Sequence, residues 1–366
     1  MLQRNKTIIL LSLGTTKRKY LKSNTKFLFH NNDKMRDKDP TRTVQLRKRF
    51  SADATRRLKS LKRDIKKSIV DNDIFGLKNQ AQLPTALAEL PANKFRYTYD
   101  ANKVNGFMAW LEQQHKQGLI ETSTIGARGA EPWSNTYIRS AYQKGLYQAR
   151  QELISGRADI PAADTLGSGV SAAFHRPFHA DRAALLYTRI FNALKGVTQA
   201  MDAQISHELT KGMTEGVSPY EMARRITDRV DKIGIVRARL ITRTEVVNAH
   251  NQASLREYEW AEQEIGETIK VQWWTALDER VRSSHRARHG KIYDRATASG
   301  MLGEPNCRCT LLSVVGSEGE KEAKRSLKDI PALDSWKREV PSEDGRTAFD
   351  TGIKAALPKD WQDKNV

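Results

Sequence analysis

Cysteine and long apolar runs are what this sequence has least of. Its 366 residues contain two cysteines, Cys307 and Cys309, with one residue between them. That spacing argues against a framework of disulfides and favours a reducing compartment. No apolar run approaches the roughly 18 residues that a transmembrane helix needs. The apolar stretch 8–13 is too short for a signal peptide and lacks a small-residue cleavage site. We therefore expect neither export by that route nor a membrane partner.

Negative charge is also in short supply. Asp and Glu number 43 against 62 Lys and Arg, which gives a net charge of +19. Residues 1–35 hold eight Lys and Arg against one Asp, and residues 36–67 hold thirteen against four. A basic segment on a nearly balanced body is typical of a protein that meets a polyanion. A solvated helix face or an unfolded tail gives the same charge count, so these interpretations stay open.

The basic segment Thr43–Val70 is predicted to be a helix, because its apolar residues recur in part at helical spacing. Such a helix buries one face and offers the other to phosphates. Aromatic residues are nearly absent from it, so contact with DNA would be made to the backbone and would not depend on sequence. The cations that we predict to contact phosphates are Arg47, Lys48, Arg49, Arg56, Arg57, Lys59, Lys62, Arg63, Lys66 and Lys67.

Helical periodicity predicts four further long helices, at residues 99–119, 133–153, 177–215 and 235–264. The third carries about six turns of apolar stripe, which we interpret as the core of a helix bundle. A coiled-coil seam with a second copy of the chain is the alternative. Ser218–Glu221 is a capping box that starts a short helix running to Lys232, and Gly234 is expected to break the helix after that residue.

The stretch 268–315 contains both cysteines, two of the eight histidines and the pair Trp273–Trp274. Residues 268–275 predict a strand, since Ile269, Val271 and Trp273 share one face by period two. Residues 307–315 predict a second strand that ends in an apolar run. Between the two strands lies a segment rich in Arg, His and Gly, which we expect to form a loop.

Four sequence elements follow one another here: W-W-x-x-x-D-x-R-V, a single H, H-G-K-x-Y and P-N-C-R-C. Their order resembles the phage head morphogenesis family, the phage Mu F-like minor head proteins. Segment 243–251 also resembles the helix that precedes this motif in the family, so the resemblance covers roughly residues 236–316. Many members carry C-x-x-C where this chain has Arg282 and His285, which rules out a four-cysteine metal site. The motif residues are Arg243, Glu245, Asn248, Trp273, Trp274, Asp278, Arg280, His285, Gly290, Pro305, Asn306, Cys307, Arg308 and Cys309.

The resemblance implies a non-enzymatic, low-copy component of the phage head. It would associate with the portal protein at the portal vertex and act in head assembly and DNA packaging. Contact with the major capsid or scaffolding protein, and ejection together with the DNA, are further implications. The implied location is the virion, inside the head or at the portal vertex, and the host cytoplasm during assembly. Some relatives carry a toxin enzyme after the motif, but only about fifty polar residues follow it here, fewer than a typical domain.

The motif offers a candidate zinc site made of His285, His289, Cys307 and Cys309. A structural zinc site uses about four nitrogen and sulfur ligands, and His-x₃-His suits ligands on a helix. The alternative is that both cysteines pack as small apolar residues and both histidines lie on the surface. We therefore expect no cofactor, and binding of a zinc ion by these four residues is the alternative.

Enzymatic chemistry is less well supported by the motif. A His-Asn-His nuclease needs a histidine after the asparagine, and none follows Asn306 here. No cysteine or serine has an evident histidine and orienting acid within reach along the sequence. A structural role remains, in which Asp278 and Arg280 form a charge-assisted lock across the two strands. Asn306 would accept unusual turn angles, Gly290 would permit a tight return, and the two tryptophans would point to opposite faces.

Helix 235–264 carries a polar face that includes Thr244, Asn248 and Asn251. One hypothesis is that this face docks the loop after Asp278 by holding its backbone amides and carbonyls. The equally weighted alternative is a solvated face.

We expect a mostly α protein with a small α+β module, made of a helix and a β-hairpin-like unit. The expected divisions are a basic extension at 1–34, a basic arm and connector at 35–90, a helical domain at 91–235, the module at 236–316 and a polar tail at 317–366. More ordinary sequence begins at Met35, which we expect to be the native start. The alternative function is a non-enzymatic, sequence-independent DNA-binding protein with a zinc-stapled module.

Overall fold

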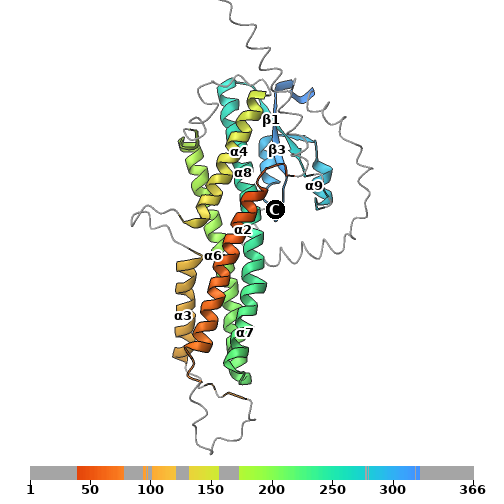
Figure 1. Cartoon of the computed structure of the whole chain (residues 1–366). Helices are drawn as coiled ribbons and strands as arrows, with labels where there is room; N and C mark the ends of the chain where they lie inside the picture. Colours follow the sequence, from red (N-terminus) through yellow and green to blue (C-terminus); the bar gives the residue numbers. More distant parts are fainter. Residues whose placement is uncertain are drawn as a thin grey trace, which may run out of the picture.

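The computed structural model describes residues 39–77, 94–95, 97, 101–120, 132–155, 173–276, 278, 280–317 and 319–321. Long helices lie side by side, and a small antiparallel sheet packs beside α4 and α8 (Figure 1). This arrangement confirms the expected fold class. The helices are α2 (Val44–Lys66), α3 (Ala101–Gly118), α4 (Trp133–Ser155), α6 (Pro177–Glu215), α7 (Pro219–Arg229), α8 (Val236–Ile265), α9 (Ser283–Arg288) and α10 (Arg295–Gly300), and the strands are β1 (Ile269–Trp274), β2 (Ile292–Tyr293) and β3 (Thr310–Val315).

The apolar stripe of α6 faces the inside of the bundle. Ile190, Met201 and Ile205 are fully buried, and α6 packs against α8, α4 and α7. α2 joins the same core through Phe50 and Leu58. The bundle interpretation of this stripe is therefore confirmed, since the chain's own helices cover it.

Several helix ends follow the local signals in the sequence. The hydroxyl of Ser218 accepts a hydrogen bond from the backbone N–H of Glu221 at 3.2 Å, which caps α7 as the capping box predicts. Gly216 and Gly266 end α6 and α8 in the left-handed conformation, where glycine carries no steric penalty. At α2 the carboxylate of Asp39 accepts from the N–H of Val44 at 2.8 Å.

The expected break at Gly234 is wrong. The chain continues from α7 through a π-helical turn, Val230–Ile235, directly into α8. A Cβ on Gly234 would lie 3.0 Å from Sδ of Met201 and 3.2 Å from Cδ2 of Leu58. Glycine suits this position because α6 and α2 approach the turn closely, and a larger residue would make Met201 or Leu58 shift by a few tenths of an ångström, while the helix runs on.

The sheet has three strands in the order β2-β1-β3, with β1 antiparallel to both neighbours. The register pairs Trp273 with Leu311, so the two predicted strands do fold back on each other. Two details of the prediction are wrong. The second strand begins at Thr310 rather than Cys307, and the expected loop contains α9, β2 and α10.

α8 contributes to two apolar cores. Its first part, including Ile241 and Ala249, lies in the core of the helix bundle. Its last part, including Tyr258, packs with Trp273 and Leu311 in a second, smaller core beneath the sheet. The sheet is thus mounted on the end of a long rigid helix, which fixes the position of the segments that follow it.

Within the described residues, no helix is both long enough and apolar enough to cross a membrane. The expected domain boundaries stay predictions. The basic extension 1–34, most of the connector before α3 and most of the tail after 317 lie outside the described residues.

Candidate metal centre

The turn before β3, residues 305–309, is hydrogen-bonded to the polar face of α8. Asn251 donates from Nδ2 to the carbonyl of Cys309 at 2.8 Å, and its Oδ1 accepts from the hydroxyl of Thr310 at 3.0 Å. The hydroxyl of Thr244 accepts from the N–H of Asn306 at 3.0 Å. These buried contacts confirm the docking hypothesis over the solvated face. Asn248 does not reach the turn and contacts Glu245 instead, at 3.5 Å.

The special backbone positions of the motif lie where the sequence predicts them. Asn306 has φ of 57°, which asparagine tolerates better than most residues, and it follows Pro305 in the turn. Gly290 has φ of 77° and donates its N–H to the carbonyl of Trp273 at 2.7 Å. Both turns bring the segments that flank β1 back against it.

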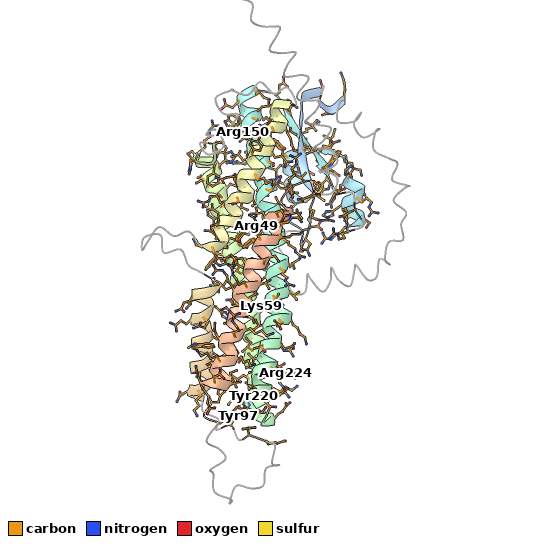
Figure 2. The ribbon with its side chains drawn as sticks, viewed as in Figure 1. Arg49, Lys59, Tyr97, Arg150, Tyr220 and Arg224 are labelled. Carbon is orange, nitrogen blue, oxygen red and sulfur yellow. The ribbon has the colours of Figure 1, made fainter. Side chains whose placement is uncertain are left out.

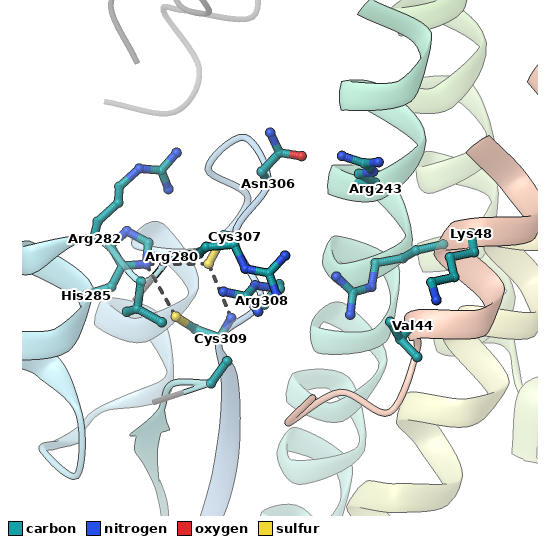
Figure 3. A pocket seen from close by; sticks show the side chains of 13 residues that line it. Val44, Lys48, Arg243, Arg280, Arg282, His285, Asn306, Cys307, Arg308 and Cys309 are labelled. Carbon is teal, nitrogen blue, oxygen red and sulfur yellow. Dashed lines mark hydrogen bonds between the residues drawn. The ribbon is translucent and has the colours of Figure 1, made fainter. Parts of the chain in front are cut away.

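His285, Cys307 and Cys309 converge on one buried point (Figure 3). Nδ1 of His285 lies 3.3 Å from Sγ of Cys309 and 3.5 Å from Sγ of Cys307. The three ligand atoms all lie within 4.8 Å of one another. Among the described residues this is the group of His, Cys, Asp or Glu side chains whose geometry suits a metal ion.

His289, the fourth expected ligand, lies elsewhere, so that part of the prediction is wrong. α9 ends at Arg288, and His289 has an extended backbone, so the i, i+4 spacing of a helix does not apply. Nδ1 of His289 accepts from the N–H of Thr275 at 3.1 Å, and its ring packs on Trp274 with centroids 4.6 Å apart.

Glu304 lies on the other side of the His285 ring. Its Oε2 is 2.9 Å from Nε2 of His285, which leaves Nδ1 directed at the two sulfurs. Burial alone would lower the pKa of His285, but hydrogen bonds to Cys307 and Glu304 raise it to about 9. The hydrogen bond from Cys309, followed by that from His285, holds the pKa of Cys307 well below its usual range. The same contact between the thiols raises the pKa of Cys309.

No histidine and orienting acid lie near either cysteine along the sequence, yet the fold brings both to Cys307. Cys307, His285 and Glu304 stand in the order of a thiol nucleophile, a base and an orienting acid. The site differs from a catalytic cysteine–histidine pair because a second thiol, that of Cys309, also lies close to Nδ1 of His285. The sequence predicts that His285 and the two cysteines meet, but it carries no signal for Glu304 behind the ring.

Asp278 makes the predicted lock, but with a different arginine. Arg308 donates from Nη1 and Nη2 to the two carboxylate oxygens of Asp278, at 2.6 and 2.5 Å. Arg280 lies 3.5 Å away and its side chain is 81% exposed. A residue two positions along the chain cannot tie two segments together, whereas Arg308 comes from the turn before β3. The expected Asp278–Arg280 lock is therefore corrected to Asp278–Arg308.

A cavity of about 440 Å³ opens between α8, the start of α2 and the Cys-His cluster, which is formed by His285, Cys307 and Cys309. Figure 3 shows Arg243 and Lys48 on its helical side, opposite the two cysteines. Some of its charge is balanced by neighbours: Arg308 binds Asp278, and Arg282 lies 3.2 Å from Glu304. The cationic residues that line it are Arg47, Lys48, Arg243, Arg280, Arg282 and Arg308.

The two tryptophans point to opposite faces, as predicted. Trp273 is fully buried in the sheet's core, with the ring of His285 edge-on at 5.8 Å. Trp274 packs on His289 at the other face. Glu245 of the motif is buried against Arg189 of α6 at 2.8 Å, a partner that the sequence does not reveal.

A buried polar network in the bundle also escapes sequence analysis. Glu257 lies 2.7 Å from Nε of Arg150 and 3.0 Å from Nε2 of His179, and all three side chains are at most 1% exposed. The hydroxyl of Tyr142 lies 2.8 Å from Nδ1 of His179. The four residues come from three helices, α4, α6 and α8, so their spacing along the chain does not predict the network.

The predicted phosphate contacts on α2 divide into two groups. Three are at least partly buried and held by the protein itself: Arg47 by Asp39, Arg57 by the carbonyl of Gly118, and Lys62 by Asp231. Arg56 pairs with Asp53 but stays exposed. The others are exposed on α2 or on the π-helical turn Lys67–Asp71 that follows it, and their role stays a prediction. They are Lys48, Arg49, Arg56, Lys59, Arg63, Lys66 and Lys67.

Known proteins resemble parts of this chain. Residues 203–312 match the family described as phage Mu protein F like protein, a range that begins earlier than the motifs suggest. The minor head protein GP7 of Bacillus phage SPP1 is 25% identical over 213 residues, which cover 53% of this chain and 62% of that protein. An NAD(+)–arginine ADP-ribosyltransferase, EFV, of Enterococcus faecalis is 27% identical over 150 residues, which cover 36% of this chain and 30% of that protein. No solved structure matches the chain.

The chain thus spans less than two thirds of the length of both relatives. The family match includes the last part of α6, all of α7 and α8, β1, the Cys-His cluster and the start of β3. The motif residues of the sequence lie inside it. Residues 203–312 therefore match the phage Mu F-like family that the motifs predict, and the chain is similar to a phage minor head protein.

Proposed function

We propose that this chain is a minor head protein that acts in phage head morphogenesis, associated with the portal vertex and taking part in DNA packaging. The observation that supports this proposal is the family match over residues 203–312, together with the SPP1 minor head protein. The site built on those residues is consistent with a role in holding shape. Its motif side chains are used in contacts within the chain, such as Asp278–Arg308 and Asn251–Cys309.

The test is co-purification with the portal protein from infected cells. A tagged chain is expected to sediment with the portal ring before DNA is packaged, and to remain with it after nuclease treatment. Retention that disappears with nuclease would mean that DNA alone bridges the two proteins. A chain that is absent from both portal complexes and finished heads would contradict the proposal.

We further propose that the exposed cations of α2 contact packaged DNA. Figure 2 shows Arg49 and Lys59 one above the other along α2. With Arg56, Arg63 and Lys66 they recur every three, four or seven residues, so they share one exposed side of the helix. Such a row can neutralise successive phosphates without reading bases.

The salt dependence of DNA binding measures these contacts. Each lost phosphate contact lowers the slope of log K against log salt by about one. The double variant Lys59→Ala/Arg63→Ala is therefore expected to reduce the slope by about two. The matched control, Lys211→Ala/Lys232→Ala, removes the same charge from other helices and is expected to leave it unchanged. Equal slopes for both variants would show that only net charge matters.

The second candidate function is a sequence-independent DNA-binding protein whose module is stapled by zinc. The convergence of His285, Cys307 and Cys309 favours it. A chain that carries metal and binds DNA, but never accompanies the portal ring, would replace the first proposal by this one. An ADP-ribosyltransferase activity is not proposed, because the match covers 30% of that relative.

A further inference from the structure

Two thiols and one imidazole nitrogen meet where the segment after β1 returns to the sheet. In a tetrahedral zinc site, with Zn–S near 2.3 Å and Zn–N near 2.0–2.1 Å, neighbouring nitrogen and sulfur ligands lie about 3.5 Å apart. The distances from Nδ1 of His285 are 3.3 Å to Cys309 and 3.5 Å to Cys307. We propose that His285, Cys307 and Cys309 bind one zinc ion, which ties α9 to the turn before β3.

The orientation of His285 is an independent observation that points to a metal. Oε2 of Glu304 lies 2.9 Å from Nε2, at ion-pair distance, so Nδ1 is the nitrogen presented to the sulfurs. Histidines that bind metals usually donate their second ring N–H to a carboxylate or carbonyl, which fixes the tautomer and the ring. Trp273 adds a wall of the pocket, with its ring edge-on to His285.

The sulfur ligands are held as firmly as the histidine. Asn251 binds the carbonyl of Cys309, and Thr244 binds the N–H of Asn306 just before Cys307. Arg308, between the two cysteines, is locked to Asp278. A site whose ligands are positioned by separate rigid contacts is preorganised, which reduces the ordering needed when the ion binds.

The charges around the cluster suit a divalent cation bound by thiolates. Two thiolates balance the charge of Zn²⁺, and nearby arginines stabilise thiolates. Arg308 and Arg282 are themselves paired with Asp278 and Glu304, so they do not confront the ion with uncompensated charge. All three residues line the cavity, so a water from the cavity would complete the four ligands that zinc takes.

The experiment measures metal in the full-length chain, purified under reducing conditions and without added metal or a metal-affinity step. Elemental analysis is expected to find one zinc per chain. Removal by chelator and titration with Co²⁺ is expected to give visible d–d bands and near-ultraviolet thiolate-to-cobalt bands that saturate at one equivalent. These readouts need no variant and no assay of activity.

Variants then assign the ligands. Cys307→Ser, Cys309→Ser and His285→Gln are each expected to abolish stoichiometric binding. His289→Gln is the matched control, a histidine four residues away, and is expected to keep one zinc. Glu304→Gln removes the carboxylate behind the ring and is expected to raise the dissociation constant for zinc by about 10–100-fold.

Thiol chemistry gives a readout that survives if a variant fails to fold. In the zinc-loaded wild-type chain both thiols are expected to resist iodoacetamide, and chelation is expected to make them reactive. A wild-type chain whose thiols stay reduced and which binds no stoichiometric zinc or cobalt would overturn the proposal. So would fast alkylation of Cys307 alone in the presence of zinc, which would indicate a nucleophile activated by His285. Loss of metal in His289→Gln to the same extent as in His285→Gln would overturn the ligand assignment.

Discussion

The helix bundle and the sheet module are stabilised in different ways. The bundle buries apolar side chains from α2, α4, α6, α7 and α8, so its core extends along the long helices. The module has a smaller core around Trp273 and Tyr258, and its turn donates a hydrogen bond to Thr244 and accepts one from Asn251. A small core stabilises a fold less, so specific polar contacts have a larger share. The difference implies that single residues matter more in the module.

The largest effect is expected for Trp273→Ala, which empties the centre of the module's core. Trp273 is fully buried, so the free energy of unfolding should fall by about 3–5 kcal/mol. Trp274→Ala is the matched control. The side chain of Trp274 is partly exposed, so this substitution should lower the free energy of unfolding by about 1 kcal/mol. Urea denaturation measures both. Hydrogen exchange should show that Trp273→Ala lowers the protection of amides in the sheet before it lowers that of amides in the bundle. Equal losses of protection in α6 would contradict the difference between the module and the bundle.

A smaller effect is expected at the lock between Asp278 and Arg308. A double-mutant cycle with Asp278→Ala and Arg308→Ala should give a coupling energy of about 1–2 kcal/mol. The same cycle with Arg280→Ala should give less than about 0.5 kcal/mol, because Arg280 is exposed and more distant. If Arg280 couples to Asp278 as strongly as Arg308 does, the lock is the one that the sequence suggested.

A pH-dependent effect is expected at His250 of α8, which faces Gln148 of α4 inside the bundle. Burial lowers the pKa of His250 to about 4. The unfolded chain therefore takes up this proton first as the pH falls. Stability is then lost between about pH 6.5 and pH 4, by about 1.4 kcal/mol per pH unit. Denaturation at several pH values should show a shallower decline in His250→Gln, and identical slopes would rule out His250 as the source.

Local signals predict much of this fold. The ends of α7 and α8 follow from Ser218 and Gly266, because capping and left-handed termination depend on a few neighbouring residues. Gly234 was misjudged since a glycine can serve either to end a helix or to admit a close neighbour, and only the packing of α6 and α2 decides which. β2 was missed because two residues, Ile292 and Tyr293, are too few to show alternation.

The candidate site was predicted less completely. Cys307, Cys309 and His285 were expected as ligands, and they do meet. His289 was included because a four-residue spacing suits a helix, but α9 ends one residue too early. Glu304 was not expected to contribute, since its role depends on which side of the His285 ring the turn passes. Arg280 was predicted to pair with Asp278, but Arg308 does so instead, because the turn before β3 brings it close in space.

The sequence by itself determined the helical stripe, the capping box at Ser218, the two strands and the resemblance to the family, because these depend on spacing and residue type over short distances. Tertiary structure alone decided which partners meet: Arg308 for Asp278, Arg189 for Glu245, and Glu304 behind His285. The physical reason is that ion pairs and metal ligands depend on distance in space. The distances between these partners are fixed only when the sheet packs against the end of α8.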